Sequence, residues 1–269
     1  MCISTFVEFY IMNTINQIFF SPTETTKKIV NKIGNGIGFS QQFETDITLY
    51  KNNYNFKESD LVIIGAPVYA GRIPEVVIER ISDLKGSNSL AVVVVVYGNR
   101  EFDDALLELR DLATDKGFNV ISAAAFIGEH SFSDSIYPIA ADRPNEKDLE
   151  LAFEYGEKIK SLINSGDIKN NISVDGNRPY KERKQAAAFS PITYKDRCSL
   201  CMKCVDLCPT NAIDKNNPLI TEAQLCIKCA ACVKTCPSNA RVFENEYIKS
   251  VAKRLNSLCN IPKNPSIFI

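Results

Sequence analysis

The sequence predicts an α/β protein with an open, doubly wound parallel sheet, followed by a smaller α+β module rich in cysteine. Apolar runs alternate with amphipathic stretches over the first 165 residues, which is the pattern of parallel strands joined by helices. The run Leu90 to Val96 is apolar, mostly β-branched and without alternation, as in a central parallel strand buried on both faces. Eight of the ten cysteines then lie between Cys198 and Cys236, which marks the second module.

The first element is a strand at residues 15–20, and the turn after it is rich in hydroxyl groups. The turn contains Ser21, Thr23, Thr25 and Thr26, and apolar residues at helical spacing follow it. A helix N-terminus offers free N–H groups and a positive dipole end, which suit a phosphate dianion. An ordinary N-cap also prefers Ser and Thr, but four hydroxyl groups exceed what a cap requires. We therefore favour a phosphate site, although not a G-x4-G-K-S/T loop, because that motif is absent.

The remaining elements of the first module follow in order. We expect an edge strand at 43–49, buried strands at 61–64, 90–96 and 118–127, and helices at 74–84, 102–113 and 149–163. The glycines at 34, 36 and 38 are predicted to end the first helix. The loops Ser21–Thr26, Ala66–Arg72 and Tyr97–Arg100 each follow the C-terminal end of a strand, where open parallel sheets bind their ligands. We expect these three loops to converge on one site.

The second module is built on two cysteine runs, Cys198–Pro209 and Cys226–Pro237. Both read C-x2-C-x2-C-x3-C-P, and their first cysteines are 28 positions apart. Iron in a cubane cluster takes one thiolate at each corner, and three cysteines at this spacing can surround three corners. Zinc or disulfides are the alternatives. Zinc sites usually combine separated C-x2-C pairs or histidine, and the only histidine, His130, lies far upstream, so we favour clusters.

These runs resemble those of bacterial two-cluster ferredoxins, in which the fourth cysteine of each run binds the other cluster. The resemblance implies two 4Fe–4S clusters with crossed ligands. One would be held by Cys198, Cys201, Cys204 and Cys236, and the other by Cys226, Cys229, Cys232 and Cys208. Lys203 and Ala231 stand where ferredoxins often have Gly, which does not affect ligation.

The first two thirds of the chain resemble flavodoxin, and the whole chain is similar to the anaerobe family of flavodoxin–ferredoxin fusion electron-transfer proteins. The turn Ser21–Thr26 resembles the flavodoxin phosphate loop (S/T)-x-T-G-x-T, with Glu24 in place of Gly. The resemblance implies FMN, its phosphate held by Ser21, Thr23, Thr25 and Thr26. It also implies that the isoalloxazine ring lies between Pro67, Val68, Tyr69 and Ala70 on one side and the backbone of Gly98 and Asn99 on the other.

Several residues near these loops have a simpler interpretation. Tyr69 is the expected stacking ring, but it could equally pack on the edge of the sheet. Arg72 and Arg100 are more often solvated surface residues than flavin contacts. His130 is more often a satisfied loop residue than a proton donor. Glu24 places a carboxylate in the phosphate loop, which weakens the case for FMN unless its side chain turns to solvent.

The chain divides into a flavodoxin-like domain at 1–165, a polar linker at 166–188, a ferredoxin domain at 189–243 and a tail at 244–269 with a short helix near 248–255. Residues 1–11 are a possible extension before Met12, and they lack the basic region and cleavage site of a signal peptide. The net charge of −1 gives no electrostatic case for nucleic acid or an anionic membrane. Cysteines that gather in two runs indicate a reducing cytoplasm, and the clusters favour an anaerobic cell.

The sequence therefore predicts an electron-transfer iron–sulfur flavoprotein that moves electrons between two 4Fe–4S clusters and FMN, and so couples one- and two-electron steps. Its expected partners are redox proteins, such as ferredoxin-type donors or acceptors. The alternative is a ferredoxin-type electron carrier whose flavodoxin-like domain is a flavin-free docking module. A third hypothesis, reduction of an organic substrate at the flavin, has only Tyr69 and His130 as acid–base candidates.

Overall fold

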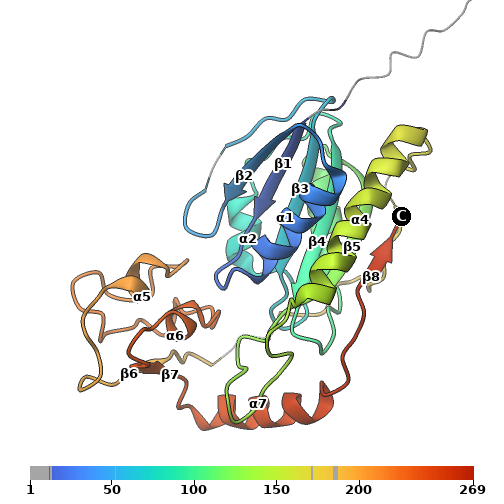
Figure 1. Cartoon of the computed structure of the whole chain (residues 1–269). Helices are drawn as coiled ribbons and strands as arrows, with labels where there is room; N and C mark the ends of the chain where they lie inside the picture. Colours follow the sequence, from blue (N-terminus) through green and yellow to red (C-terminus); the bar gives the residue numbers. More distant parts are fainter. Residues whose placement is uncertain (1–11, 13, 52, 171, 184–186) are drawn as a thin grey trace, which may run out of the picture.

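The computed structural model describes residues 12, 14–51, 53–170, 172–183 and 187–269, and the statements below concern these residues. The possible N-terminal extension, residues 1–11, lies outside them. A sheet flanked by helices forms the larger part of the protein, and the cysteine-rich module lies beyond one end of this sheet (Figure 1). None of the described helices is long and apolar enough to cross a membrane.

Six strands form the main sheet, in the order β2-β1-β3-β4-β5-β8. Five of them are parallel and have the order 2-1-3-4-5 of the flavodoxin-like doubly wound fold, which confirms the predicted fold class. The strands are β1 (Thr14–Phe19), β2 (Gln41–Asp46), β3 (Leu61–Pro67), β4 (Leu90–Tyr97), β5 (Asn119–Ile127) and the antiparallel β8 (Ser266–Phe268). β2 is the predicted edge strand, two residues earlier than expected.

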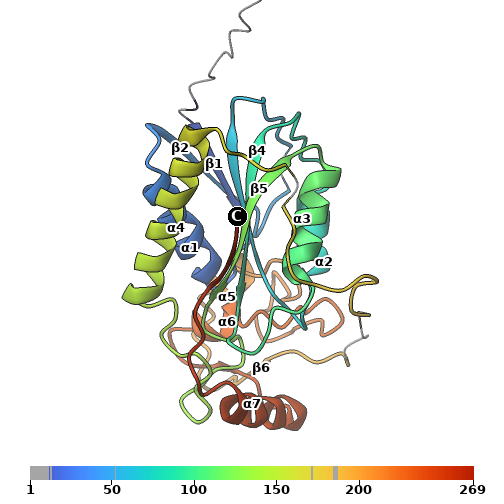
Figure 2. The same cartoon turned by 90° about the vertical axis from the view of Figure 1, so that its right-hand side faces the viewer.

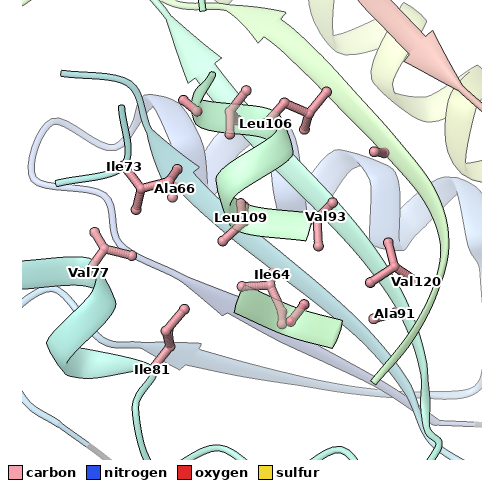
Figure 3. Close-up of a cluster of buried hydrophobic side chains, with 14 of the residues drawn as sticks. Ile64, Ala66, Ile73, Val77, Ile81, Ala91, Val93, Leu106, Leu109 and Val120 are labelled. Atoms are coloured by element: carbon pink, nitrogen blue, oxygen red, sulfur yellow. The ribbon is translucent and has the colours of Figure 1, made fainter. Parts of the chain in front are cut away.

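Helices cover both faces of the sheet, as Figure 2 shows. α1 (Thr25–Ile37) and α4 (Glu146–Ser165) pack on one face, and α2 (Glu75–Arg80) and α3 (Ala105–Asp115) on the other. β3 is buried along its whole length, and β4 and β5 at all but their first residue, because they lie between these two layers. In the core between α2, α3 and the sheet, Leu106 and Leu109 lie above Val93 and Ile64 (Figure 3).

The glycines near the end of α1 have two different roles. Gly38 ends the helix as predicted, with φ 63° and its N–H donated to the Gly34 carbonyl at 2.9 Å. Gly36 instead lies where α1 crosses α4, and a Cβ there would come within 2.0 Å of the Phe153 carbonyl oxygen. Gly156 of α4 is equally close to α1, since its Cβ would lie 2.2 Å from the Ile33 oxygen. The two helices approach this closely only because both positions lack a side chain.

The cysteine-rich module is small and irregular. Its two-stranded sheet pairs β6 (Ile192–Thr193) with β7 (Arg241–Val242), and the short helices α5 (Lys203–Asp206) and α6 (Ala231–Lys234) each contain or adjoin the third cysteine of a run. Between the runs, Ile213 and Thr221 form an antiparallel bridge. The predicted α+β class of this module is therefore confirmed.

The C-terminal tail does more than form the predicted helix. α7 (Glu246–Leu258) is followed by β8, which adds an antiparallel edge strand beside β5. The Ser122 hydroxyl of β5 donates to the Phe268 carbonyl at 2.7 Å and helps to hold this strand. The tail thus returns from the cysteine-rich module to the main sheet, an arrangement that the sequence did not reveal.

The middle of the predicted linker is packed on the α3 side of the sheet. Ile172 and Val174 are buried in the core on the α3 side of the sheet. The buried Asp104 carboxylate, just before α3, accepts hydrogen bonds from the backbone N–H and the side-chain amide of Asn177, at 2.8 and 3.0 Å. The polar composition of this segment therefore reflects specific contacts with the first domain.

Candidate cofactor sites

The hydroxyl-rich turn lies between β1 and α1, at the C-terminal end of the sheet. Ser21 is buried, its backbone N–H donates to the Thr48 hydroxyl at 2.8 Å, and its own hydroxyl accepts from the Lys27 N–H at 3.0 Å. Thr25 and Thr26 begin α1, so their N–H groups have no acceptor within the helix. Thr23 and Thr25 are half-buried. The four predicted residues therefore surround one helix N-terminus.

Thr26 gives the clearest indication that this turn fits an anion. The residue is 1% exposed, and its Oγ1 has no hydrogen-bond partner among the described residues. A buried hydroxyl without a partner costs about 1–3 kcal/mol, so native proteins rarely leave one. An acceptor at the start of α1, such as a phosphate oxygen, would satisfy it.

The backbone conformation of Glu24 explains why the related flavodoxin motif has glycine at this position. Its φ of 63° lies in the left-handed region, which Gly adopts without strain. The Glu24 carboxylate is more than half exposed, and it lies 3.6 Å from the Lys27 ammonium. Its side chain therefore turns to solvent, and Lys27 offsets its charge, so the turn remains compatible with an anion.

The second loop, after β3, places Tyr69 toward the cysteine-rich module. Ala70 and Gly71 have positive φ, and Tyr69 and Arg72 exchange backbone hydrogen bonds at 3.0 and 3.1 Å in a tight turn. Burial raises the pKa of the Tyr69 phenol well above its usual value, charge on the Cys229 and Cys226 thiols raises it further, and the Ser131 hydroxyl lowers it. Tyr69 thus lies within electrostatic range of the second cysteine run.

The third loop, after β4, is held by the tail. The Asn99 carboxamide donates to the carbonyls of Cys259 and Ile261, at 2.8 and 2.9 Å, and accepts the Lys263 N–H at 3.0 Å. The side chain of Asn99 is therefore committed to the tail, and only its backbone remains for a ligand. Sequence reasoning did not find this role, because the partners lie about 160 positions away.

A fourth loop, after β5, joins the three that were predicted. The His130 ring packs on Gly98 so closely that a Cβ on Gly98 would lie 2.4 Å from His130 Cδ2. Burial, together with the nearby charges of Lys234 and Arg100, lowers the pKa of His130 to about 4. His130 Nδ1 accepts the Phe132 N–H at 3.0 Å, so the neutral ring carries its proton on Nε2. His130 is therefore a neutral residue in the wall of the site near pH 7.

The two arginines of these loops are engaged elsewhere. Arg72 forms a two-point contact with the buried Glu108 carboxylate, at 2.9 and 2.7 Å, and stacks on Tyr180 of the linker. Arg100 pairs with Asp103. These contacts leave neither guanidinium free for a ligand. Arg100 is partly exposed, as the simpler interpretation expected, whereas Arg72 is largely buried rather than solvated because it pairs with the buried Glu108.

The eight cysteines of the two runs line two separate cavities. The first cavity is lined by Cys198, Cys201, Cys204 and Cys236, and the second by Cys208, Cys226, Cys229 and Cys232. The fourth cysteine of each run therefore reaches the cavity formed by the other run. Met202 and Ala230, the residues before α5 and α6, both have φ near 60°, which turns each cysteine loop around its cavity.

The two cavities differ in exposure and in thiol acidity. Cys201 is exposed, whereas Cys229 is buried. Burial raises the pKa of Cys229 to about 12 and that of Cys232 to about 11. Cys236 differs, because hydrogen bonds from Ser238 and from backbone N–H groups outweigh its burial and lower its pKa. The second cavity is thus the more enclosed one, and thiolates in it require a compensating positive charge.

The cavities do not suit a single metal ion. Among the described residues, no three His, Cys, Asp or Glu side chains are close enough together to hold one ion. The nine described cysteines are also free thiols rather than disulfides. Four cysteines around a space too wide for one ion fit a polynuclear cluster, which carries its thiolates on separate iron atoms.

The second cavity adjoins the loops of the first domain. Ile227, between two of its cysteines, packs against the same apolar core as Val68 of the loop after β3. Lys234 of α6 pairs with Glu129 of the loop after β5 at 2.6 Å, and Arg80 of α2 donates to the Pro209 carbonyl at 3.2 Å. Two modules distant in sequence thus meet at the end of the sheet where the predicted loops converge (Figure 1).

The family comparisons concern the cysteine-rich module. Residues 191–214 and residues 223–242 each match a family described as a 4Fe-4S binding domain. The two matched segments contain all eight cysteines of the two runs, and the second segment ends with β7, so both halves of the cysteine-rich module are of the 4Fe–4S binding type. No curated protein matches the chain.

Solved structures resemble the first domain. They include a flavodoxin from the domain Archaea, with 14% identity and a TM-score of 0.40, which covers 56% of this chain and 99% of that one. A flavodoxin of Streptococcus pneumonia has 17% identity and a TM-score of 0.38 over 55% of this chain and 98% of that one. Rubredoxin oxygen:oxidoreductase from the anaerobe Desulfovibrio gigas has 14% identity and a TM-score of 0.40 over 57% of this chain and 36% of that one.

Proposed function

We propose that this chain is an electron-transfer iron–sulfur flavoprotein that moves electrons between two 4Fe–4S clusters and FMN. One observation carries the proposal: Lys234, in the helix after Cys229, pairs at 2.6 Å with Glu129 of the loop after β5, so the second cavity adjoins the loops expected to surround a flavin. A cluster in that cavity and a flavin at the loops would be neighbours.

The residues that line each cavity support the ligands proposed for the two clusters. Cys198, Cys201, Cys204 and Cys236 would bind the outer cluster, and Cys208, Cys226, Cys229 and Cys232 the inner one. Each cluster exchanges one electron at a time. The exposed Cys201 makes the outer site the point at which a redox partner, such as a ferredoxin-type donor or acceptor, would deliver or collect electrons.

The FMN site is proposed from the turn at α1 and the loops beside it. Ser21, Thr23, Thr25 and Thr26 would hold the phosphate, since they surround a helix N-terminus that contains an unpaired buried hydroxyl. Pro67, Val68, Tyr69 and Ala70 would flank the ring on one side, and the backbone of Gly98 and Asn99 on the other. When bound, FMN takes two electrons and releases them singly, so the pair of modules would join two-electron to one-electron chemistry.

Contacts between the modules support a fixed route rather than a flexible tether. The ion pair of Glu129 with Lys234 and the contact of Ile227 with the core hold the second cysteine run at the loops. Electrons would therefore pass from the outer cluster to the inner cluster and on to FMN, or in reverse. The protein would work in a reducing cytoplasm, where free thiols persist and clusters can assemble.

The decisive experiment is anaerobic purification followed by analysis of iron, acid-labile sulfide and extracted flavin. We expect eight irons and eight acid-labile sulfides per chain, from two 4Fe–4S clusters. We also expect FMN to bind to the protein after its flavin has been removed. Rapid mixing with dithionite should then show cluster bleaching before flavin reduction. Zinc in place of iron, or flavin that stays oxidised while both clusters are reduced, would contradict the proposal.

A flavin-free docking role is the second candidate, and Glu24 is the observation that favours it. Its carboxylate stands in the predicted phosphate turn, where FMN would add further negative charge. Titration of the purified chain with FMN separates the two functions, because a docking module would not bind FMN at micromolar concentrations.

A further inference from the structure

A buried arginine lies between the two cysteine-lined cavities. Arg241 of β7 is 2% exposed, and its side chain lines both cavities. No other charged residue lines both of them. Its position makes it a shared neighbour of the two groups that the cysteines would hold.

The oxygen partners of the Arg241 guanidinium are all neutral, and the guanidinium also donates to the Cys232 thiol. It donates to the Thr193 hydroxyl at 2.9 Å, the Pro218 carbonyl at 2.9 Å and the Thr221 hydroxyl at 2.7 Å. The Arg241 Nε is buried without a partner, and among the described residues no carboxylate forms a salt bridge with Arg241. A buried charge without a counter-charge costs several kcal/mol, so a fold rarely retains one without compensation.

The internal repeat shows that packing does not require this charge. Arg241 follows Cys236 by five positions, as Ile213 follows Cys208, and Ile213 is also buried. An aliphatic side chain therefore satisfies the equivalent position in the first half of the repeat. The arginine needs another explanation, and eight thiolates on its two sides supply the missing negative charge.

We propose that Arg241 raises the reduction potentials of both 4Fe–4S clusters by providing a positive charge between them. The inference rests on the cluster part of the proposed function. A cluster becomes more negative when it takes up one electron, and a nearby positive charge favours that reduced form. Net charge and hydrogen bonding at the sulfurs are known determinants of cluster potential.

The test measures cluster potentials in full-length protein prepared without oxygen. R241M and R241Q remove the charge and keep a side chain of similar length, whereas R241K keeps the charge. T221V is the matched control, because it removes one hydrogen-bond partner of the guanidinium and leaves the charge in place. Iron and sulfide analysis reports loading, and a dithionite titration followed by electron paramagnetic resonance reports the midpoint potential of each cluster.

We expect both potentials to fall in R241M and R241Q, by about tenfold in the one-electron reduction equilibrium or roughly 59 mV. R241K and T221V should stay near the wild type. Neutral variants that hold both clusters at wild-type potentials would overturn the proposal. If R241M and R241Q bind no clusters, R241K decides between the explanations. R241K protein with two clusters near wild-type potentials supports a role for the charge. R241K protein without clusters, when T221V binds both clusters normally, refutes that role.

These outcomes are independent of the flavin. A chain that binds no FMN but shows the shift in R241M refutes the proposed electron route and leaves the role of Arg241 intact. A chain that binds FMN and transfers electrons, but whose cluster potentials are unchanged in R241M, supports the proposed electron route and refutes the role of Arg241.

Discussion

Lys234 Nζ lies 2.6 Å from Glu129 Oε2, across the boundary between the iron–sulfur module and the loop after β5. Both side chains are partly shielded, at 25% and 30% exposure, so the pair is worth more than a fully solvated one. It joins the helix that follows Cys229 to the loop that carries His130 and Ser131. The contact therefore fixes the inner cysteine cavity relative to the proposed flavin site.

Breaking this ion pair should slow electron transfer between the modules more than it reduces stability. We expect K234M and E129Q each to lower the rate of flavin reduction by the clusters severalfold, with a change in unfolding free energy of about 1 kcal/mol or less. Stopped-flow absorbance would measure the rate. The matched control is E246Q, which breaks the exposed Lys249–Glu246 pair of α7. Equal rates in K234M and the wild type would contradict a positional role.

Tyr69 provides a test of the flavin loop. Y69L should weaken FMN binding about tenfold, or ~1.4 kcal/mol, because it removes aromatic stacking and keeps an apolar side chain. Y69F should bind FMN nearly as well as the wild type, since it retains the ring. Quenching of flavin fluorescence measures both affinities. An affinity unchanged in Y69L would mean that Tyr69 packs on the sheet edge only.

Thr26 tests the phosphate turn with an isosteric change. T26V removes a buried hydroxyl that has no partner, so the flavin-free protein should be as stable as the wild type or slightly more stable. FMN affinity should fall tenfold or more, because a hydrogen bond to a charged phosphate is lost, worth about 1.5–3 kcal/mol.

Riboflavin, which has no phosphate, supplies the internal comparison for T26V, and its affinity should not change. The control variant is T114V in α3, whose hydroxyl already donates to the Arg110 carbonyl at 3.0 Å. A T26V protein that loses riboflavin and FMN affinity equally would place the phosphate elsewhere.

His130 gives a prediction for pH. The pKa of about 4 in the folded protein lies below the usual 6.5, so the unfolded chain binds a proton more readily than the folded one between these values. Stability should therefore rise with pH from about 4 to 6.5 and level off above that. The chain has one histidine, so its ring signals in a nuclear magnetic resonance titration are unambiguous. We expect no titration between pH 5.5 and 8, and an ordinary pKa near 6.5 would show that the ring is solvated.

The sequence predicted those helices, strands and loops that leave a local pattern of apolar or polar residues. β3, β4 and β5 appear as apolar runs because both of their faces are covered, and the three loops were placed at strand ends because parallel strands share one direction. The crossed grouping of cysteines such as Cys208 and Cys236 was implied by resemblance, and their cavity positions agree with it. FMN binding and cluster ligation stay predictions.

What the sequence did not reveal depends on contacts between distant segments. β8 is three residues long and pairs with β5 far upstream, so no local periodicity marks it. Asn99 was expected to offer its backbone to a ligand, but nothing in its neighbourhood indicates that its side chain binds the tail. Arg241 is an unremarkable charge in the sequence, and only the comparison with Ile213 could have drawn attention to it.

The return of the tail to the main sheet also has a consequence for how the chain folds. β5 and β8 are separated in sequence by the linker, the whole iron–sulfur module and α7, so their pairing closes a very long loop. Such non-local contacts form late, after shorter loops have closed. The edge of the sheet beside Ala124 is therefore completed only after the cysteine-rich module has folded next to the main sheet. The pairing of β8 with β5 then holds the two modules together.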